Sequence, residues 1–396
     1  MFSIDKIQEK LQEFGLDGWL LYDFRFCNPL ARRVLGLSEK LFLSRRWFYF
    51  IPASGDPVKI NHKIEPTALN GFPGKQIIYL RWQELENALL TALAGKQRIA
   101  MEYSPNNAIP YLSRVDAGTI EFIKSLDKEI LSSGNLIQIF ESCLNKEQFQ
   151  YHLDAAVHTR EAYEIVFRFI ADSIRKNIEI KESSVIHVIL DHFAKHNLFT
   201  DHPPIVGVNS HSGDPHYSTS NETDRSIKEG DFILVDLWAK YHVPNGVYSD
   251  LTRTGFVGTE VPEKFTKIFD IVASARDAAI EKIKSSFFKG VSVEGWEIDK
   301  ATREVIENSG YGPYFCHRTG HSIGKEVHGN GANIDGLETN DTREILPGSL
   351  FSIEPGIYLE EFGVRSEINI FVDWEKNVHI TGGEPQKFIV PILKNY

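Results

Sequence analysis

Five residues in the C-terminal half of the chain carry side chains that bind divalent metal ions in other proteins. They occur in the order Asp236, Asp250, His321, Glu354 and Glu367. Carboxylate oxygens together with one imidazole suit hard or borderline divalent cations such as Mn²⁺, Co²⁺, Zn²⁺ and Fe²⁺. Two such cations about 3.5–4 Å apart can hold and activate one water molecule between them. The residue types therefore indicate metal-dependent chemistry.

The local sequence around the two glutamates strengthens this interpretation. Glu354 follows the apolar run SLFSI and precedes Pro355-Gly356, which predicts a position at the end of a buried strand. Glu367 lies inside VRSEINIFV, a second strand-like run. A buried carboxylate must be paired, protonated or bound to a metal. By contrast, a lone Asp in DLTRT is more often a turn or cap residue, and His321 alone would be an ordinary packed or surface histidine.

Five neighbourhoods together resemble a known family. The segments SDLTRT, HRTGHSIG, VHG, SIEPGIY and GVRSE, in this order, resemble those of the pita-bread metallopeptidases. That superfamily includes aminopeptidase P, prolidase and methionine aminopeptidase. The resemblance covers roughly residues 155–396. A preceding domain and the GVRSE form favour the Xaa-Pro branch over methionine aminopeptidase.

The resemblance implies a dinuclear metal site. Asp236 would bind one metal ion through both oxygens, and Asp250 and Glu367 would bridge the two ions. His321 and Glu354 would complete the shell of the other ion. The native metal would be Mn²⁺, with Co²⁺, Zn²⁺ or Fe²⁺ as alternatives.

The resemblance also implies helper residues around the metals. His216, in the segment DPHYSTSN, matches a histidine that approaches the substrate carbonyl, and His328 matches one that contacts the scissile peptide. His317 matches a histidine of the active-site wall. Arg365 matches an arginine near the metal centre, and its spacing predicts that it shares a strand face with Glu367.

The implied reaction is hydrolysis of an Xaa-Pro peptide bond, of the aminopeptidase P or prolidase type, by attack of a metal-bridging hydroxide. Glu354 would relay the proton to the leaving amine. The partner would be a peptide with proline in second position, and the assembly a homodimer. One alternative is a small-molecule amidine or amide hydrolase, or a lyase, on the same fold. A non-catalytic binding protein is another, although such relatives usually lose ligands and this chain keeps all five.

Whole-chain properties narrow the class further. The chain has 396 residues, a net charge of −11 and no lysine-rich run, which argues against a nucleic-acid surface. No apolar run approaches the length of a membrane span. The N-terminal segment reads as an amphipathic helix without the features of a signal peptide. Three cysteines form no CxxC motif and predict reduced, mostly buried thiols. We therefore expect a cytoplasmic enzyme.

The order of expected elements predicts an α+β protein with two domains. Residues 1–150 alternate short strands and helices, which predicts a small α/β domain, creatinase-like by resemblance. Its expected work is to restrict the substrate and to make subunit contacts. Residues 151–396 begin with two strongly helical segments and continue with strands and helices. They are expected to form the pita-bread catalytic domain, with the ligands on the inner face of its sheet.

Overall fold

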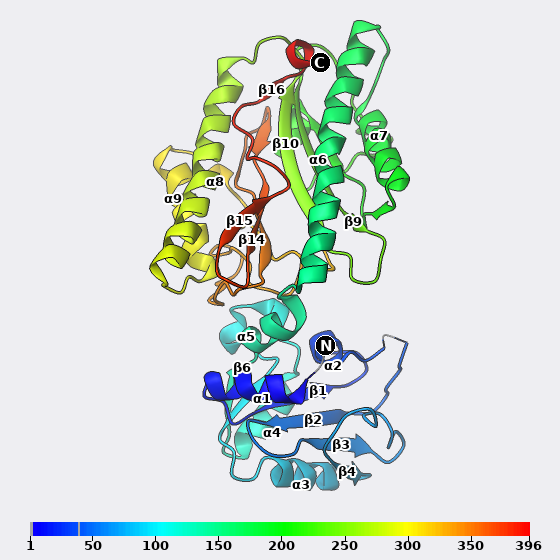
Figure 1. Ribbon diagram of the computed structural model, residues 1–396, viewed down its shortest axis with the longest axis vertical. Coiled ribbons are helices and arrows are strands. Elements are labelled where there is room, and N and C mark those ends of the chain that lie inside the picture. The colour runs from blue at the N-terminus through cyan, green and yellow to red at the C-terminus, as the bar shows by residue number, and fades with distance from the viewer. Residues whose placement is uncertain (1–2, 39) are drawn as a thin grey trace. The chain divides into compact units, whose positions relative to one another are not determined.

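The computed structural model describes residues 3–38 and 40–396, drawn in Figure 1. The chain divides into two compact units, Met1–Glu141 and Ser142–Tyr396. The long helix α6 (Lys146–Arg175) lies entirely in the second unit, so this unit begins before the predicted residue 151. The roles assigned to the two domains stay predictions.

A six-stranded mixed sheet forms the centre of the first unit, in the order β4-β3-β2-β1-β5-β6. The strands are β1 (Gly18–Asp23), β2 (Trp47–Pro52), β3 (Val58–His62), β4 (Lys75–Tyr79), β5 (Arg98–Met101) and β6 (Glu129–Ser132). Neighbours β1 and β2 are antiparallel, whereas β1 and β5 are parallel. This arrangement agrees with the predicted α/β domain.

Both faces of that sheet are covered by helices. Alternate residues of β1 point to opposite faces, so Trp19 and Leu21 join one apolar cluster, and Leu20 and Tyr22 join another. The first cluster includes residues of α1 (Ile4–Glu13), α2 (Pro29–Leu35) and α5 (Gly134–Ile137). The second includes residues of α3 (Trp82–Ala92) and α4 (Ala117–Ser125). Burial on both sides explains why β1 reads as a continuous apolar run.

The second unit is built on several sheets. Its larger sheet has the strand order β16-β10-β9-β7, with β8 also paired to β9. A three-stranded sheet has the order β11-β14-β15, and β12 pairs with β13. The strands are β7 (Leu198–Phe199), β8 (Ile205–Val208), β9 (Phe232–Tyr241), β10 (Ser249–Phe256), β11 (Leu350–Ile353), β12 (Gly356–Tyr358), β13 (Gly363–Arg365), β14 (Ile368–Val372), β15 (Val378–Thr381) and β16 (Val390–Pro391).

Four long helices flank these sheets on two sides (Figure 1). They are α6, α7 (Glu182–Lys195), α8 (Glu263–Lys289) and α9 (Gly295–Asn308), and a short α10 (Ile392–Asn395) ends the chain. Helix α6 starts with a capping box, in which Asn145 and Gln148 each accept a hydrogen bond from the other's backbone N–H. Helix α8 ends at Gly290, whose φ of 67° is the left-handed conformation that glycine adopts at little cost.

Strand β9 separates two environments. Its odd-numbered residues Ile233, Val235, Leu237 and Ala239 share an apolar cluster with α6 and α7. Its even-numbered residues Phe232 and Leu234 join a different cluster that includes α8. Because side chains along a strand alternate between its two faces, the next even-numbered residue, Asp236, points away from α6 and α7.

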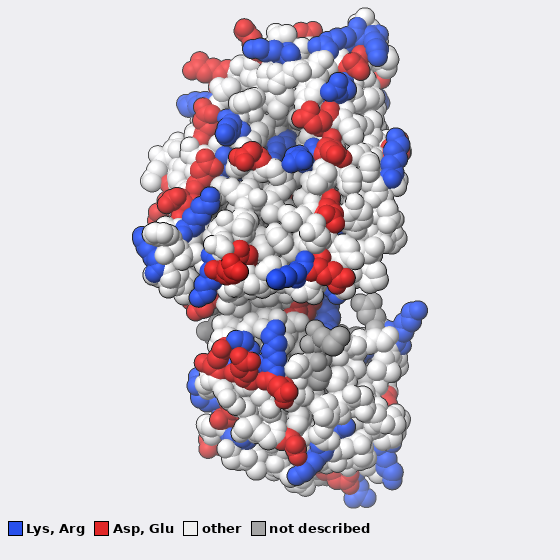
Figure 2. Space-filling view, in the orientation of Figure 1, with Lys and Arg blue, Asp and Glu red and all other residues white. Residues whose placement is uncertain are grey.

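The structure also bears on the expectations about membrane spans, surface charge and cysteines. Within residues 3–38 and 40–396, no helix combines the length and apolar character needed to cross a membrane. Figure 2 shows Lys and Arg interspersed with Asp and Glu over the visible face. The cysteines form no disulfide with one another, but the prediction that they are mostly buried is wrong, since Cys27 and Cys316 are exposed and Cys143 is half-buried. Cys27 lies in the loop after β1, next to Arg25 and Phe26, whose φ angles are positive.

The buried His152 of α6 makes the stability of the second unit sensitive to acid. Its Nδ1–H donates to the carbonyl of Tyr248 over 2.7 Å, and its Nε2 lies 2.6 Å from Thr381 Oγ1. Burial lowers the pKa of His152 from 6.5 to about 4. Between about pH 6.5 and pH 4 the histidine is protonated in the unfolded chain but neutral in the folded chain. The free energy of unfolding therefore falls as the pH falls through this range.

We expect His152→Gln to remove part of this acid sensitivity. Between pH 7 and pH 5 the free energy of unfolding of the wild type should fall by about 2 kcal/mol more than that of the variant, at 1.36 kcal/mol per pKa unit. Urea unfolding at both pH values measures the difference. The same substitution at the exposed His202 is the control, and equal pH slopes for wild type and His152→Gln would contradict the prediction.

Candidate metal centre

Asp236 and Asp250 lie on the paired strands β9 and β10, as the hairpin-like stretch between them predicts. In the antiparallel register Asp236 is opposite Thr252, and Asp250 is opposite Trp238. Residues two apart on a strand point to the same face, so Asp250 and Thr252 share a face with Asp236. That face is turned away from α6 and α7. The amide of Asn369 fixes the Asp250 backbone, accepting from its N–H at 3.1 Å and donating to its carbonyl at 2.5 Å.

Glu354 and Glu367 lie where the chain passes between two small sheets. Glu354 follows β11, and its backbone N–H donates to the carbonyl of Thr319 at 2.7 Å. Glu367 lies after β13 and before β14, so the expectation of one continuous strand through VRSEINIFV is wrong. The strand breaks because β13 pairs with β12, whereas β14 pairs with β11. The carbonyl of Glu367 accepts from Arg253 Nη1 at 2.7 Å instead of from a neighbouring strand.

His321 is aimed at the carboxylates by the hydrogen bonds of its own loop. Its backbone N–H donates to Ser352 Oγ at 3.0 Å, and its carbonyl accepts from the Ser352 N–H at 2.9 Å. Its Nδ1 lies 3.2 Å from the carbonyl of Ser322 and must carry the proton, because a carbonyl only accepts. In the neutral ring, Nε2 then presents a lone pair, 3.5 Å from Asp250 Oδ2 and 3.4 Å from Glu354 Oε1.

Asp236 and Glu367 each have one oxygen fixed by the protein and one left free. Arg365 Nη2 donates to Asp236 Oδ2, and Thr252 Oγ1 donates to Glu367 Oε2 at 2.8 Å. The other two oxygens, Asp236 Oδ1 and Glu367 Oε1, are buried and have no hydrogen-bond partner among the described residues. Unpaired buried oxygens are costly, so a cation is the partner that this arrangement suits.

Electrostatics supports the same conclusion. Burial raises the pKa of Asp236 to about 6 and that of Asp250 to about 7. Burial also raises the pKa of Glu354, and raises that of Glu367 well above its ordinary value. For His321, burial lowers the pKa and disfavours the protonated ring. Carboxylates that repel one another, facing a lone pair of a neutral imidazole, are compatible when divalent cations lie between them.

The structure brings all five predicted ligands to this place. Ligand atoms of Asp250, His321 and Glu367 lie within 4.8 Å of one another. Glu354 joins them through its contact with His321, and Asp236 joins them through Arg365, which also donates to the Thr252 hydroxyl that holds Glu367. The donor set therefore fits one or more divalent metal ions, and these residues are candidate metal ligands.

A hydrogen-bonded chain connects two predicted helpers. Arg365 Nη1 donates to Tyr358 OH at 2.9 Å, and Tyr358 OH lies 2.7 Å from His317 Nε2. His317 Nδ1 lies 2.7 Å from the carbonyl of Arg318, so Nδ1 carries the proton and Nε2 accepts from the tyrosine. Burial lowers the pKa of His317 to about 3, which keeps the ring neutral. Arg365 also donates from Nε to Thr252 Oγ1 at 3.1 Å, so Arg365 and Glu367 meet at Thr252 despite the strand break.

The remaining helpers lie at the edge of this cluster. The ring of His328 packs edge-on against His321, with centroids 4.4 Å apart. Proximity to His321, followed by burial, lowers the pKa of His328 to about 3. His216 is exposed, and its backbone N–H donates to Asp214 Oδ1 at 3.0 Å.

Sequence reasoning missed Tyr358 and Thr252. Both lie in segments that carry the resemblance, SIEPGIY and SDLTRT, but neither is charged or a usual metal ligand. Alternation along β10 offers a signal for Thr252, since residues two after Asp250 share its face. No spacing rule predicts that Tyr358 meets Arg365 and His317, because these residues lie on different segments.

Comparison with known proteins defines the class. A profile of Metallopeptidase family M24 matches residues 152–374. The chain belongs to this family. A protein of Mycobacterium tuberculosis named "Probable dipeptidase PepE" is 36% identical over 189 residues, covering 48% of this chain and 46% of that protein. The chain thus matches less than half the length of that relative.

Solved structures extend the likeness to nearly the whole chain. The dipeptidase PepE from Mycobacterium ulcerans has a TM-score of 0.69 and 22% identity, covering 98% of this chain and 96% of that one. An X-prolyl aminopeptidase from Caenorhabditis elegans, described as a cytosolic enzyme with a di-nuclear active site, has a TM-score of 0.61 and 16% identity. That match covers 96% of this chain and 60% of the other. The predicted α+β fold, a pita-bread domain preceded by a smaller domain, is confirmed.

We expect Tyr358→Phe to destabilise the protein. The substitution leaves Arg365 Nη1 and His317 Nε2 without their shared partner, and an unsatisfied buried polar group costs about 1–3 kcal/mol. The free energy of unfolding in urea measures the effect. Tyr314→Phe is the matched control, because Tyr314 is 45% exposed. Equal stability of the two variants would show that the bridge contributes nothing.

Proposed function

We propose that the protein hydrolyses peptide bonds that precede proline, as an aminopeptidase P or a prolidase does, with two divalent cations in the site. The observation that carries this proposal is the pair of buried, unpaired oxygens, Asp236 Oδ1 and Glu367 Oε1. They face the same cluster as His321, whose Nε2 lone pair points at Asp250 and Glu354. The PepE dipeptidase and the X-prolyl aminopeptidase named above share the fold and support a peptide substrate.

The proposed ligands are the five residues in the order of the sequence, Asp236, Asp250, His321, Glu354 and Glu367. Asp250 and Glu367 would bridge, and Mn²⁺ is the proposed ion, with Co²⁺, Zn²⁺ or Fe²⁺ as alternatives. When bound, such cations supply a nucleophile at neutral pH and polarise the carbonyl that is attacked. The protein holds the ligands ready through Arg365, Thr252 and Ser352, the last donating to Glu354 Oε1 at 3.1 Å.

Glu354 has the environment of a proton carrier. Its side chain is 15% exposed, more than those of Asp236 and Asp250, so it has the most access to the substrate side of these three carboxylates. A carboxylate beside the reacting groups can accept a proton and return it as a general acid–base catalyst. In an Xaa-Pro bond the leaving nitrogen has no N–H, so it must receive a proton before it leaves. We assign this transfer to Glu354.

His216 and His328 are assigned to the substrate carbonyl. The ring of His328 packs against that of the candidate ligand His321, and His216 is exposed in the segment that matches the family. A neutral imidazole N–H there can donate to the oxygen that becomes negative during attack. His317 has both ring nitrogens engaged, with Tyr358 and Arg318, so we assign it to the wall of the site. Arg365 orients Asp236.

The proposal also covers the role of the first unit, the subunit assembly and the cellular location. The first unit would limit substrate length and contribute contacts in a homodimer, as the resemblance implies. We assign the protein to the cytoplasm, as the cysteine pattern of the sequence indicates. The X-prolyl aminopeptidase neighbour is described as cytosolic.

Removal of metal should abolish activity reversibly. Chelated protein should lose peptidase activity and regain it with Mn²⁺ or Co²⁺. Glu367→Gln keeps the size of the side chain but removes its charge, so it should lose bound metal and activity together. Elemental analysis and a peptide assay on the same sample measure both. Glu361→Gln, at a side chain that is 75% exposed, is the control. Full activity of protein that elemental analysis shows to be free of metal would contradict the two-metal proposal.

Substrate preference tests the proline assignment. We expect metal-loaded protein to cleave Ala-Pro or Ala-Pro-Ala and to leave Ala-Ala and Ala-Ala-Ala almost untouched, as measured by kcat/KM. Preference for the dipeptide indicates a prolidase, and preference for the tripeptide indicates an aminopeptidase P. If loaded protein cleaves neither proline peptide, the proposal is wrong and a small-molecule hydrolase on the same fold takes its place.

A further inference from the structure

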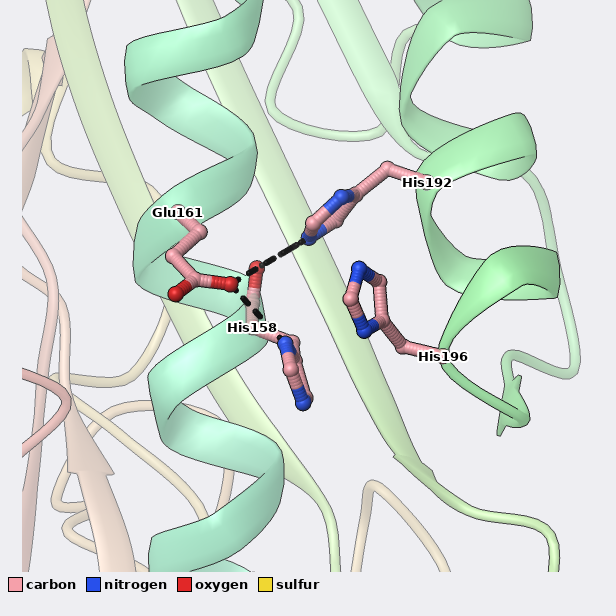
Figure 3. A group of neighbouring side chains, drawn as sticks. All are labelled: His158, Glu161, His192 and His196. Carbon is pink, nitrogen blue, oxygen red and sulfur yellow. Dashed lines mark hydrogen bonds and ion pairs between the residues drawn. The ribbon is translucent and has the colours of Figure 1, made fainter.

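A second group of metal-type side chains lies between helices α6 and α7. Figure 3 shows His158 and Glu161 on α6 facing His192 and His196 at the end of α7. The spacings of three and four residues put each pair on one face of its helix. This group was not among the predicted sites, because its two halves come together only when the helices pack.

The four side chains converge on one point. One ligand atom from each residue lies within 4.8 Å of those of the others. Glu161 Oε2 is 2.9 Å from His158 Nδ1 and 4.0 Å from His192 Nε2. The ring of His196 stacks on that of His158, with centroids 4.1 Å apart, and lies 4.6 Å from that of His192. Ligand atoms of a tetrahedral zinc site are about 3.3 Å apart, from bond lengths near 2.0–2.2 Å, so rotations of these side chains are sufficient.

One ring nitrogen of His192 is already engaged: its Nε2 donates to the carbonyl of His158 over 3.1 Å, so a metal ion would bind Nδ1 or replace this hydrogen bond. Burial lowers the pKa of His192, which disfavours protonation of its ring. Glu161 supplies the single negative charge within the group. A surface cleft lined by Glu161, His192 and His196 gives a hydrated ion a path to the site.

The group is separate from the candidate metal centre. The face of β9 that packs against α6 and α7 carries its odd-numbered residues, whereas Asp236 points to the opposite face. His158 Nε2 lies 3.1 Å from the hydroxyl of Tyr241, the last residue of β9. An ion bound here would therefore join α6 to α7 and would not take part in the peptidase reaction.

We propose that His158, Glu161, His192 and His196 form a second metal site, which binds one borderline divalent cation, Zn²⁺ in preference, and ties α6 to α7. Three imidazole nitrogens and one carboxylate oxygen make a four-coordinate set typical of Zn²⁺, and Co²⁺ binds such sets in the same geometry. All four positions come from the protein, so the role of the ion is structural.

The test compares ion stoichiometry between variants. Chelated full-length protein is titrated with Zn²⁺ by calorimetry and with Co²⁺ by visible absorption. Wild type should bind one more Zn²⁺ per chain than the double variant His192→Gln/His196→Gln and should show a four-coordinate Co²⁺ spectrum that the variant lacks. His196→Gln alone should weaken this site at least about tenfold, since even the loss of an outer-shell partner costs about 10–100-fold. His187→Gln, at an exposed histidine of the same helix, should match wild type.

These experiments test the second metal site independently of the candidate metal centre, because the ligands of that centre are unchanged in every variant. Equal stoichiometry and spectra in wild type and the double variant would overturn the proposal. Should the double variant fail to fold, crystals of wild type grown with Zn²⁺ provide the answer through anomalous scattering at the zinc absorption edge. A peak between Glu161 and His192 supports the site, and its absence in zinc-containing crystals refutes it.

Discussion

The burial of several carboxylates side by side is the constraint on which the second unit depends. Asp236, Asp250 and Glu367 are almost fully buried, and each would hold a proton in an apolar interior without a compensating charge. Among the described residues, the guanidinium of Arg365 on Asp236 is the only permanent positive charge paired with a carboxylate group of these three ligands. Divalent cations are the simplest remaining compensation, which is why we propose these residues as metal ligands.

The architecture follows from keeping this polar cluster apart from the apolar packing. Strands β9 and β10 give one face to α6 and α7 and the other to the ligands, and the period of two along each strand enforces the division. The two glutamates enter from junctions where the chain changes sheets. At these junctions the backbone groups of the two glutamates lie outside a regular ladder, and Arg253 and Thr319 supply their hydrogen-bond partners. The tyrosine between Arg365 and His317 then fixes the wall of the site.

Much of this arrangement could be predicted from local sequence, and the rest depends on tertiary contacts. Alternation and turn residues indicate the β9–β10 hairpin, and the order of ligands indicates the family. The break at Glu367 could not be predicted, because VRSEINIFV has the composition of one strand and only its partners divide it. Tyr358 and the histidine cluster of α6 and α7 were missed for the same reason, since each joins residues far apart in the sequence. The exposure of Cys27 and Cys316 shows that cysteine type alone does not predict burial.

The most direct test of the account locates metal in crystals. Crystals of the chelated protein soaked in Mn²⁺ should give anomalous difference peaks at coordination distance from Asp236 Oδ1, Glu367 Oε1 and His321 Nε2, the three atoms that the fold leaves without a partner or with a lone pair facing carboxylates. Two peaks within about 4 Å of each other would match a dinuclear centre. Full Mn²⁺-dependent peptidase activity in solution, with no peak at these atoms in the soaked crystals, would contradict the central claim that the buried carboxylates are organised around metal ions.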